Sequence, residues 1–271
     1  MRVLVWNLFH GRAQPPAGRP LLQEFADALA GWEWDVALLQ EVPPWWPPLL
    51  GSHCRADCRT ALTSRNQLLP LRRAIASRAP DRLKSNGGGA NAILVRAPLT
   101  ITAHGRRRLR IRPERRVMHA VRLADPHGGP FDGAWIGNVH TQLGHWNDAA
   151  GMAAPLADLE RSTTQLEAWA DDAARGMTTP ERGTGRGAGT PKRGLGGIGG
   201  ADRSPIVLGG DFNLPREAVA ANLADDWARI ATSGPDHVAG RGVVAASPSV
   251  RPERGTLSDH APLLVALTAR R

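Results

Sequence analysis

Residues that can bind a metal ion or move a proton stand directly after several short apolar runs of this 271-residue sequence. Apolar runs of four to six residues between turn residues are typical of buried strands. The polar residues at their ends are Asn7, Glu41, His140, Asp211 and Asn213, and Asp259 and His260 immediately precede the last run. If neighbouring strands present these ends at one edge of a sheet, three carboxylates and two imidazoles share one cleft.

Carboxylates gathered in one cleft repel each other and lose hydration, so they stay ionised only when paired or bound to a cation. Oxygen donors suit a hard cation, and Mg²⁺ prefers one or two carboxylates with water completing its shell. The oxygen donors here are Asn7, Glu41, Asp211, Asn213 and Asp259. The sequence has no HExxH motif and no Cys/His set with zinc spacing, which makes zinc the less favoured metal.

The elements that must position these residues follow from the hydrophobic pattern. Helical spacing of apolar residues predicts helices at Leu21–Leu29, at Pro155–Ala174 and from about Pro215 to Leu223. Strands interleaved with helices indicate an α/β fold. The predicted strands are Val3–Trp6, Val36–Leu39, Ala92–Val95, Val117–Leu123, Trp135–Val139, Ile206–Leu208 and Pro262–Leu267.

The composition excludes several classes of protein. An apolar content of 42% excludes a wholly disordered chain, and no apolar run approaches the ~20 residues that span a bilayer. No signal-peptide pattern follows Met1, and two cysteines form neither a disulfide framework nor a zinc signal. We therefore expect ordinary thiols in a reducing cytoplasm.

One segment breaks the pattern. Residues 176–200 contain ten glycines and almost no large apolar side chain, which predicts a flexible insertion. Because it lies between a predicted helix and a predicted strand, we expect one domain over residues 1–271.

The net charge of +9 is concentrated in residues 51–120, which hold 16 basic and three acidic residues. Arg108, Arg110 and Arg112 alternate with Leu109 and Ile111, as on a strand with one solvated face. A row of guanidinium groups attracts polyanions such as nucleic acid, but it also protects an edge strand from aggregation. Both interpretations stay open.

These residues, in this order, resemble the endonuclease/exonuclease/phosphatase family, which includes DNase I. The motifs that carry the resemblance are Trp6-Asn7, Leu39-Gln40-Glu41, Asn91-Ala92-Ile93-Leu94, Asn138-Val139-His140, Gly210-Asp211-Phe212-Asn213, Asp236-His237-Val238 and Ser258-Asp259-His260-Ala261-Pro262. The resemblance implies a four-layer α/β sandwich of two packed mixed sheets with helices outside. It also implies cleavage of a phosphate ester that depends on Mg²⁺ or Mn²⁺.

The resemblance further implies a role for each matched residue. Glu41 would be the principal metal ligand, assisted by Asn7 and Asp259. Asp211, held by Asn213, would orient and deprotonate the attacking water.

Other matched residues would contact the phosphate. His260, paired with Asp236, would donate to a non-bridging oxygen or take part in acid–base chemistry, and His140 would be a second donor or the acid for the leaving oxygen. Asn91 would bond the phosphate, and Arg116, or else Arg115, would supply a positive charge.

Some positions depart from the abasic-site repair enzymes of the family. Those enzymes resemble one another in an Asp two residues after the first Asn, where this chain has Phe9, and tend to carry a Lys where this chain has Pro43. An abasic-site repair role is therefore disfavoured. Trp45 and Trp46, in a proline-rich stretch after Glu41, could stack on a base or sugar or could close the end of the sandwich.

The leading hypothesis is a metal-dependent phosphodiesterase or nuclease that acts on nucleic acid or nucleotides. A phosphomonoesterase or a lipid-headgroup phosphodiesterase with the same centre is the first alternative. A non-catalytic polyanion-binding relative is the second, and the presence of Glu41, Asp211 and His260 argues against it.

Overall fold

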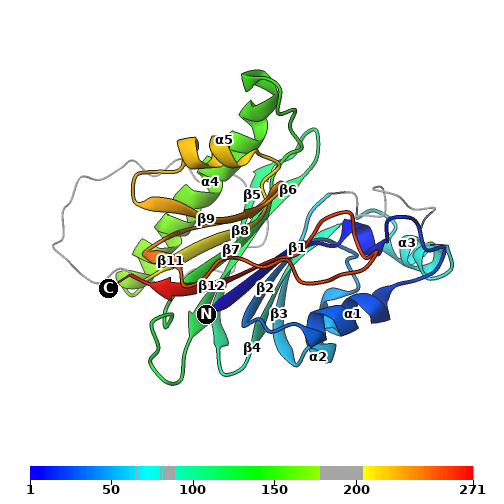
Figure 1. Cartoon of the computed structure of the whole chain (residues 1–271), viewed down its shortest axis with the longest axis horizontal. Helices are drawn as coiled ribbons and strands as arrows, with labels where there is room; N and C mark the ends of the chain where they lie inside the picture. Colours follow the sequence, from blue (N-terminus) through cyan, green and yellow to red (C-terminus); the bar gives the residue numbers. More distant parts are fainter. Residues whose placement is uncertain (65, 80, 82–88, 178–203, 271) are drawn as a thin grey trace.

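The computed structural model describes residues 1–64, 66–79, 81, 89–177 and 204–270. Two mixed six-stranded β-sheets pack face to face, with helices on their outer faces (Figure 1). This is the expected four-layer α/β sandwich. Nearly all of the glycine-rich segment predicted at 176–200 falls outside the described residues.

The first sheet carries both ends of the chain. Its central strands β1 and β2 are parallel, whereas β12, β4 and β3 pair antiparallel with their neighbours. Its strand order is β11 (Val243–Ala245), β12 (Leu263–Ala269), β1 (Arg2–Asn7), β2 (Val36–Val42), β4 (Ala90–Arg96) and β3 (Ala56–Leu62).

The second sheet is built from the middle of the chain. Its central strands β7 and β8 are parallel, and β6 and β10 flank them in antiparallel register. Its strand order is β5 (Thr100–Arg110), β6 (Arg116–Ala124), β7 (Trp135–His140), β8 (Ile206–Asp211), β10 (Asp236–Arg241) and β9 (Trp227–Ser233).

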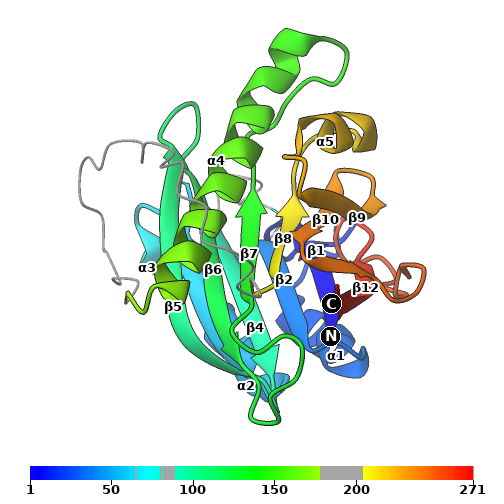
Figure 2. The ribbon, with the colours of Figure 1, turned by 90° about the vertical axis from the view of Figure 1, so that its left-hand side faces the viewer.

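The helices form the two outer layers. α1 (Leu22–Gly31) and α2 (Pro47–His53) cover the first sheet, and α4 (Ala149–Ala174) runs across the second sheet beside α5 (Arg216–Asn222) (Figure 2). A short helix α3 (Leu69–Ala76) follows β3, and a 3₁₀ turn η1 (Phe9–Gly11) follows β1.

Three apolar clusters account for the layering. The middle cluster lies between the sheets and joins Val5 and Leu38 of the first to Ile136 and Val207 of the second. The outer clusters bury α1 and α2 on one side and α4 and α5 on the other. Strands buried on both faces explain why the sequence shows continuous apolar runs rather than strict alternation.

Strand direction brings the chemistry-bearing residues to one end of the sandwich. β1, β2, β7 and β8 end there, whereas β4, β6, β10 and β12 begin there, because each of these runs antiparallel to a neighbour. Polar residues that follow some strands and precede others therefore meet at one edge.

Two sequence expectations need correction. Leu109 is buried as expected, but Ile111 is 61% exposed, because β5 ends at Arg110 and its register with β6 shifts between Arg108 and Arg110. A β-bulge of this kind breaks the two-residue alternation. The second long helix begins at Ala149 rather than at Pro155, and Asp148 caps it by accepting a hydrogen bond from the Gly151 backbone amide.

Cys54 and Cys58 are free thiols, as expected. Within the described part of the chain, we find no helix with both the length and the apolar character needed to cross a membrane.

Candidate active site

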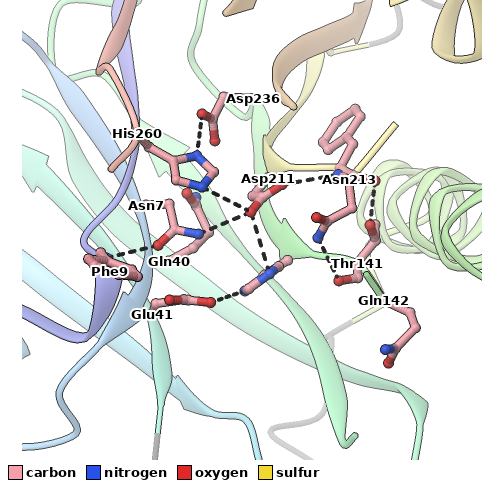
Figure 3. A network of polar contacts seen from close by, with 12 residues as sticks. Asn7, Phe9, Gln40, Glu41, Thr141, Gln142, Asp211, Asn213, Asp236 and His260 are labelled. Carbon is pink, nitrogen blue, oxygen red and sulfur yellow. Dashed lines mark hydrogen bonds and ion pairs between the residues drawn. The ribbon is translucent and has the colours of Figure 1, made fainter. Parts of the chain in front are cut away.

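The candidate active site lies where the ends of the two sheets meet, and Asp211 is at its centre (Figure 3). Asp211 ends β8 and is 2% exposed. Asn7, at the end of β1, donates its side-chain amide to Asp211 Oδ2 over 3.0 Å, and the Asn213 backbone amide donates to Oδ1 over 3.0 Å. Burial raises the pKa of Asp211 above its ordinary value, so this carboxylate is more basic than a solvated aspartate.

The backbone around Asp211 explains the preceding Gly-Gly pair. Gly210 has a φ of +145°, and a Cβ there would lie 1.8 Å from the Val139 carbonyl oxygen of the adjacent strand. Only glycine fits this approach. The close contact keeps β7 and β8 in register, so that His140 and Asp211 end side by side.

His260 and Asp236 form an acid–base pair beside Asp211. His260 Nδ1 lies 2.8 Å from Asp236 Oδ2, and its Nε2 lies 3.9 Å from Asp211 Oδ2. Burial opposes protonation of this imidazole, but the hydrogen bond and charge of Asp236 outweigh it and raise the pKa of His260 to about 9. Burial also raises the pKa of Asp236 to about 7, while its bond to His260 acts in the opposite direction. At neutral pH we take the pair as an imidazolium with a carboxylate, which leaves Nε2–H free to donate toward Asp211.

Ser258 holds this pair in place. Its hydroxyl donates to the Asn7 backbone oxygen over 2.6 Å and accepts from the His260 backbone amide over 3.0 Å. The segment before β12 is thereby fixed to the end of β1, next to the Asn7 side chain.

His140 lies between the two key carboxylates. Its Nε2 is 3.5 Å from Asp211 Oδ2 and its Nδ1 is 3.9 Å from Glu41 Oε1. Burial, with the nearby positive charge of Arg116, lowers the pKa of His140 well below its ordinary value. The resemblance implied two alternative roles for His140, a hydrogen-bond donor to the phosphate or the acid for the leaving oxygen. A neutral imidazole fits the first role better than the second.

The pKa of the Glu41 carboxyl group lies close to neutral pH. Burial and the negative charge of Asp211 raise the pKa of Glu41 to about 7. His10 Nε2 lies 3.0 Å from Glu41 Oε2, on the side of the carboxylate away from His140. Imidazoles and carboxylates therefore alternate through the site in the order His10, Glu41, His140, Asp211, His260 and Asp236.

Arg116 begins β6 and supplies the positive charge. It is 6% exposed and pairs with Glu114 over 2.9 Å, while burial lowers the pKa of Arg116. Its Nε has no hydrogen-bond partner within the described residues. A buried unpaired donor costs free energy, so an anion that accepts this hydrogen bond would be stabilised here. Arg115, the other candidate, instead donates to the backbone oxygens of Leu62 and Thr63.

Asn91 lies beneath the site. It is fully buried and donates its side-chain amide to the Val117 backbone oxygen over 3.0 Å. Val117 follows Arg116, so in this position Asn91 braces the start of β6. Contact with a phosphate stays a prediction.

The donor set around Glu41 fits a hard divalent cation. Asp259, which is exposed, and Asp211 both contribute negative charge that raises the pKa of Glu41, and a cation beside Glu41 would relieve this repulsion. Asn7 Oδ1 already accepts from the Phe9 backbone amide and has one lone pair left. Asp211, Asp236 and His260 also present ligand atoms within 4.8 Å of one another, but there the Nδ1 atom of His260 already lies 2.8 Å from Asp236 Oδ2. The Glu41 side of the site, with its unrelieved negative charge, therefore fits a cation better than this cluster does.

Backbone strain is concentrated at this site. Among the described residues, seven other than glycine have a positive φ. Five of them carry or adjoin the site: Phe9, His10, Glu41, Asn213 and Ser258. Such conformations cost on the order of 1–3 kcal/mol each and persist only where the surroundings enforce them.

Sequence reasoning missed several contributors to the site. Asn138 bridges the sheets, since it donates to the backbone oxygens of Leu39 and Ala92 and accepts from Gln40. Its place two residues before His140 was a usable signal, because a polar residue inside a buried strand needs partners. Asp158 of α4, fully buried, binds Arg110 through both oxygens and accepts from the Gln142 backbone amide.

Trp45 and Trp46 pack mainly in the hydrophobic core of the first sheet and its helices. Trp46 is 6% exposed and packs 5.5 Å from Phe25, which supports the structural alternative for this residue. Trp45 packs against the same cluster and is half-buried. An exposed aromatic residue lies elsewhere beside the site: Trp146, 45% exposed, donates its indole N–H to the Asn213 backbone oxygen over 2.9 Å.

Comparisons with known proteins bear on the family and the fold. Residues 4–260 match the sequence model of the Endonuclease/Exonuclease/phosphatase family. No curated protein matches the sequence. A solved structure of an endonuclease/exonuclease/phosphatase from Beutenbergia cavernae is similar, with 16% identity, a TM-score of 0.63 and coverage of 100% of this chain and 72% of that one.

Two further solved structures, each of a named protein, are also similar to this chain. A mannosyl-6-phosphatase from Bacteroides thetaiotaomicron has 15% identity and a TM-score of 0.61, with 99% of each chain covered. A humanized D. rerio TDP2 has 11% identity and a TM-score of 0.60, again with 99% of each chain covered. At these identities the likeness establishes the fold alone.

Proposed function

Because this chain belongs to the endonuclease/exonuclease/phosphatase family, whose members generally hydrolyse phosphate esters, we propose that it is a divalent-metal-dependent phosphodiesterase. The observation that carries the proposal is the buried Asp211 carboxylate. It is fixed by Asn7 and Asn213, lies 3.5 Å from His140 and 3.9 Å from His260, and is linked to Glu41 through His140.

In the proposed reaction Asp211 accepts the proton of the attacking water. Its raised pKa suits this role, and a positioned general base typically contributes ~10²–10⁴-fold. Asn7 and Asn213 hold both carboxylate oxygens, which fixes the direction from which the base reaches the water.

Cationic and neutral donors would receive the phosphate. His260, kept protonated by Asp236, donates to a non-bridging oxygen, and Arg116 Nε, which has no partner among the described residues, donates to another. Neutral His140 offers a further N–H. Donors already aimed at the position of developing charge lower the barrier without reorganisation.

Glu41, with Asn7 and Asp259, would hold Mg²⁺ or Mn²⁺. When bound, such an ion neutralises phosphate charge and acts as a Lewis acid. The conflict among the Glu41, Asp211 and Asp259 charges in the metal-free site supports this assignment.

We favour nucleic acid or a nucleotide as substrate. Arg106, Arg107 and Arg108 are exposed on edge strand β5, whose far end leads to Arg116. Trp146 offers an exposed ring beside Asn213, and bases stack on such rings. Arginines that follow a backbone together with an aromatic ring are typical of single-strand binding sites.

A lipid-headgroup phosphodiesterase is the second candidate, and one observation favours it. Leu143, Ile111 and Trp146 are 66%, 61% and 45% exposed, and all three lie at the active-site end of the sheets. Exposed apolar side chains around a site can enter a lipid interface.

One screen separates these candidates. The protein is incubated with Mg²⁺ or Mn²⁺ and with single-stranded DNA, RNA, bis-nitrophenyl phosphate, a sugar phosphate or sphingomyelin vesicles. We expect cleavage of the diesters and of nucleic acid, with loss of activity in EDTA. Exclusive turnover of vesicles or of the monoester would replace the substrate assignment, and no metal-dependent turnover of any of them would contradict the proposal. The cytoplasmic location expected from the cysteines stays a prediction.

A further inference from the structure

His10 lies against the carboxylate that we assign to the metal, although nothing in the sequence pattern had marked it. Its Nε2 is 3.0 Å from Glu41 Oε2, and its side chain is 13% exposed. The other oxygen of Glu41 faces His140. The Glu41 carboxylate thus has an imidazole on each side, and the one nearer to it is His10.

The turn that carries His10 is strained and firmly held. Phe9 and His10 have φ values of 49° and 56°, in the left-handed region that these residue types rarely adopt. The Phe9 backbone amide donates to Asn7 Oδ1 over 3.0 Å, and the Arg12 guanidinium lies 3.9 Å from the centre of the Phe9 ring.

The next residue closes the turn. Gly11 has a φ of +76°, and a Cβ there would lie 2.3 Å from the Trp46 ring. Only glycine fits this close packing of the turn against the core. Strained residues such as Phe9 and His10, retained at a site, are a sign of a positioned side chain.

The spacing between the two donor atoms is informative. Two neighbouring ligands of an octahedral ion, each about 2.1 Å from it, are separated by about 3.0 Å. His10 Nε2 and Glu41 Oε2 are 3.0 Å apart, so their separation matches that of two neighbouring ligands of one ion. The same distance also suits a simple hydrogen bond in which His10 only orients Glu41, and the experiment below separates the two.

We propose that His10 supplies an imidazole nitrogen to the divalent ion held by Glu41, and that this mixed nitrogen–oxygen site selects a transition-series ion over Mg²⁺. The inference rests on the proposed function, since it assumes a metal at Glu41. Mg²⁺ prefers oxygen ligands and gives up water reluctantly, whereas imidazole strengthens binding to first-row transition ions, increasingly from Mn²⁺ to Co²⁺ and beyond.

Calorimetry of the metal-free protein tests the preference. Mn²⁺, Co²⁺ and Mg²⁺ are titrated separately into the wild type, His10→Asn and the control His127→Asn, whose histidine lies exposed on a loop. Asparagine tolerates a left-handed φ, so His10→Asn keeps the turn. We expect Co²⁺ and Mn²⁺ binding in His10→Asn to weaken by at least the roughly 10–100-fold that loss of a residue orienting a ligand costs, with little change for Mg²⁺ and wild-type values in the control.

Pulsed electron paramagnetic resonance of the Mn²⁺-loaded protein tests the bond itself. A directly bound imidazole couples its ¹⁴N nucleus to the Mn²⁺ spin, and we expect this coupling in the wild type and in His140→Gln but not in His10→Asn. Absence of ¹⁴N coupling in the wild type, or its persistence in His10→Asn, would overturn the inference and leave the proposed function standing. Failure of every protein to bind metal would overturn both.

Discussion

The side-chain amide of Asn7 donates to Asp211 Oδ2 over 3.0 Å, and this bond joins the end of β1 in one sheet to the end of β8 in the other. The two residues are 204 positions apart in the sequence. One of the two hydrogen bonds that orient the proposed base therefore forms only when the sheets are packed, whereas the bond from the Asn213 backbone amide is local.

Replacement of Asp236 by Asn should move the alkaline limb of the pH–rate profile. Asp236 raises the pKa of His260 to about 9, against an ordinary 6.5, so the imidazolium needed to contact the phosphate persists until pH rises through 9. Without the carboxylate, we expect that limb to fall by one to two pH units. The measurement is kcat/KM for a diester between pH 5 and 10, with Asp226→Asn as the exposed control. An alkaline limb that stays near 9 in Asp236→Asn would remove Asp236 from this role.

Replacement of Glu41 by Gln should stabilise the metal-free protein, and the gain should depend on pH. The pKa of Glu41 is raised from 4.5 to about 7, so folding favours its neutral form; the resulting stability is present below pH 4.5 and is lost as pH rises through 7. At about 1.4 kcal/mol per pKa unit, the ionised carboxylate costs on the order of 3 kcal/mol at pH 8.

Urea unfolding in EDTA at pH 8 and pH 4.5 measures this effect. We expect Glu41→Gln to be more stable than the wild type at pH 8 and equal to it at pH 4.5. Added Mn²⁺ should stabilise the wild type and leave the variant unchanged. If the variant is equally stable or less stable than the wild type at pH 8, the ionised Glu41 carboxylate does not destabilise the folded protein.

Replacement of Asp158 by Asn should destabilise the fold and loosen the loop after His140. Asp158 is fully buried and holds both the Arg110 guanidinium and the Gln142 backbone amide. Breaking a buried ion pair on one side costs about 3–5 kcal/mol, whereas an exposed pair contributes about 0–1 kcal/mol. The matched control is Asp172→Asn, which breaks the exposed pair with Arg175 on the same helix. Equal unfolding free energies for the two variants would refute the structural role of Asp158.

Replacement of Arg107 and Arg108 by Gln should weaken nucleic-acid binding without affecting a small diester. Both residues are exposed on β5. Each lost phosphate contact reduces the log–log salt slope by roughly 0.7–0.9, so the double variant should lose about one to two units. Fluorescence anisotropy with a labelled oligonucleotide gives the slope, and Arg55→Gln, exposed at the start of β3, is the control. An unchanged slope would direct the substrate search toward small phosphoesters.

The hydrophobic pattern predicted the strands and an α/β fold because its signals are local, whereas the four-layer sandwich and the roles of the candidate residues were implied by the resemblance to the family. Apolar runs mark strands buried on both faces, and Gly-Asp-Phe-Asn and Ser-Asp-His mark strand ends, where strand direction then brings them together. Features that depend on tertiary contacts could not be predicted from the sequence. The register shift near Arg108 leaves Ile111 exposed, contrary to the alternation in the sequence, and Trp46 is buried against Phe25, where the sequence had left two interpretations open.

His10 illustrates the limit most clearly. A histidine three residues after Asn7 in a flexible-looking segment carries no periodic signal. Its place beside Glu41 depends on three consecutive positive φ angles, in a turn that packs against the Trp46 ring and is hydrogen-bonded to the Asn7 side chain. The seven strands expected from the sequence, by contrast, were predicted without any knowledge of tertiary contacts.

The central claim is that Glu41 holds a divalent ion which Asp211-dependent hydrolysis requires. The most direct measurement is turnover of bis-nitrophenyl phosphate at saturating Mg²⁺ or Mn²⁺ by the wild type, Glu41→Gln and the exposed control Glu160→Gln. We predict metal-dependent turnover in the wild type and the control, and a loss of at least about 10²–10³-fold in Glu41→Gln while its circular dichroism spectrum is unchanged. Turnover by Glu41→Gln within about twofold of the wild type, a difference well below that expected from lost charge stabilisation, would contradict the account.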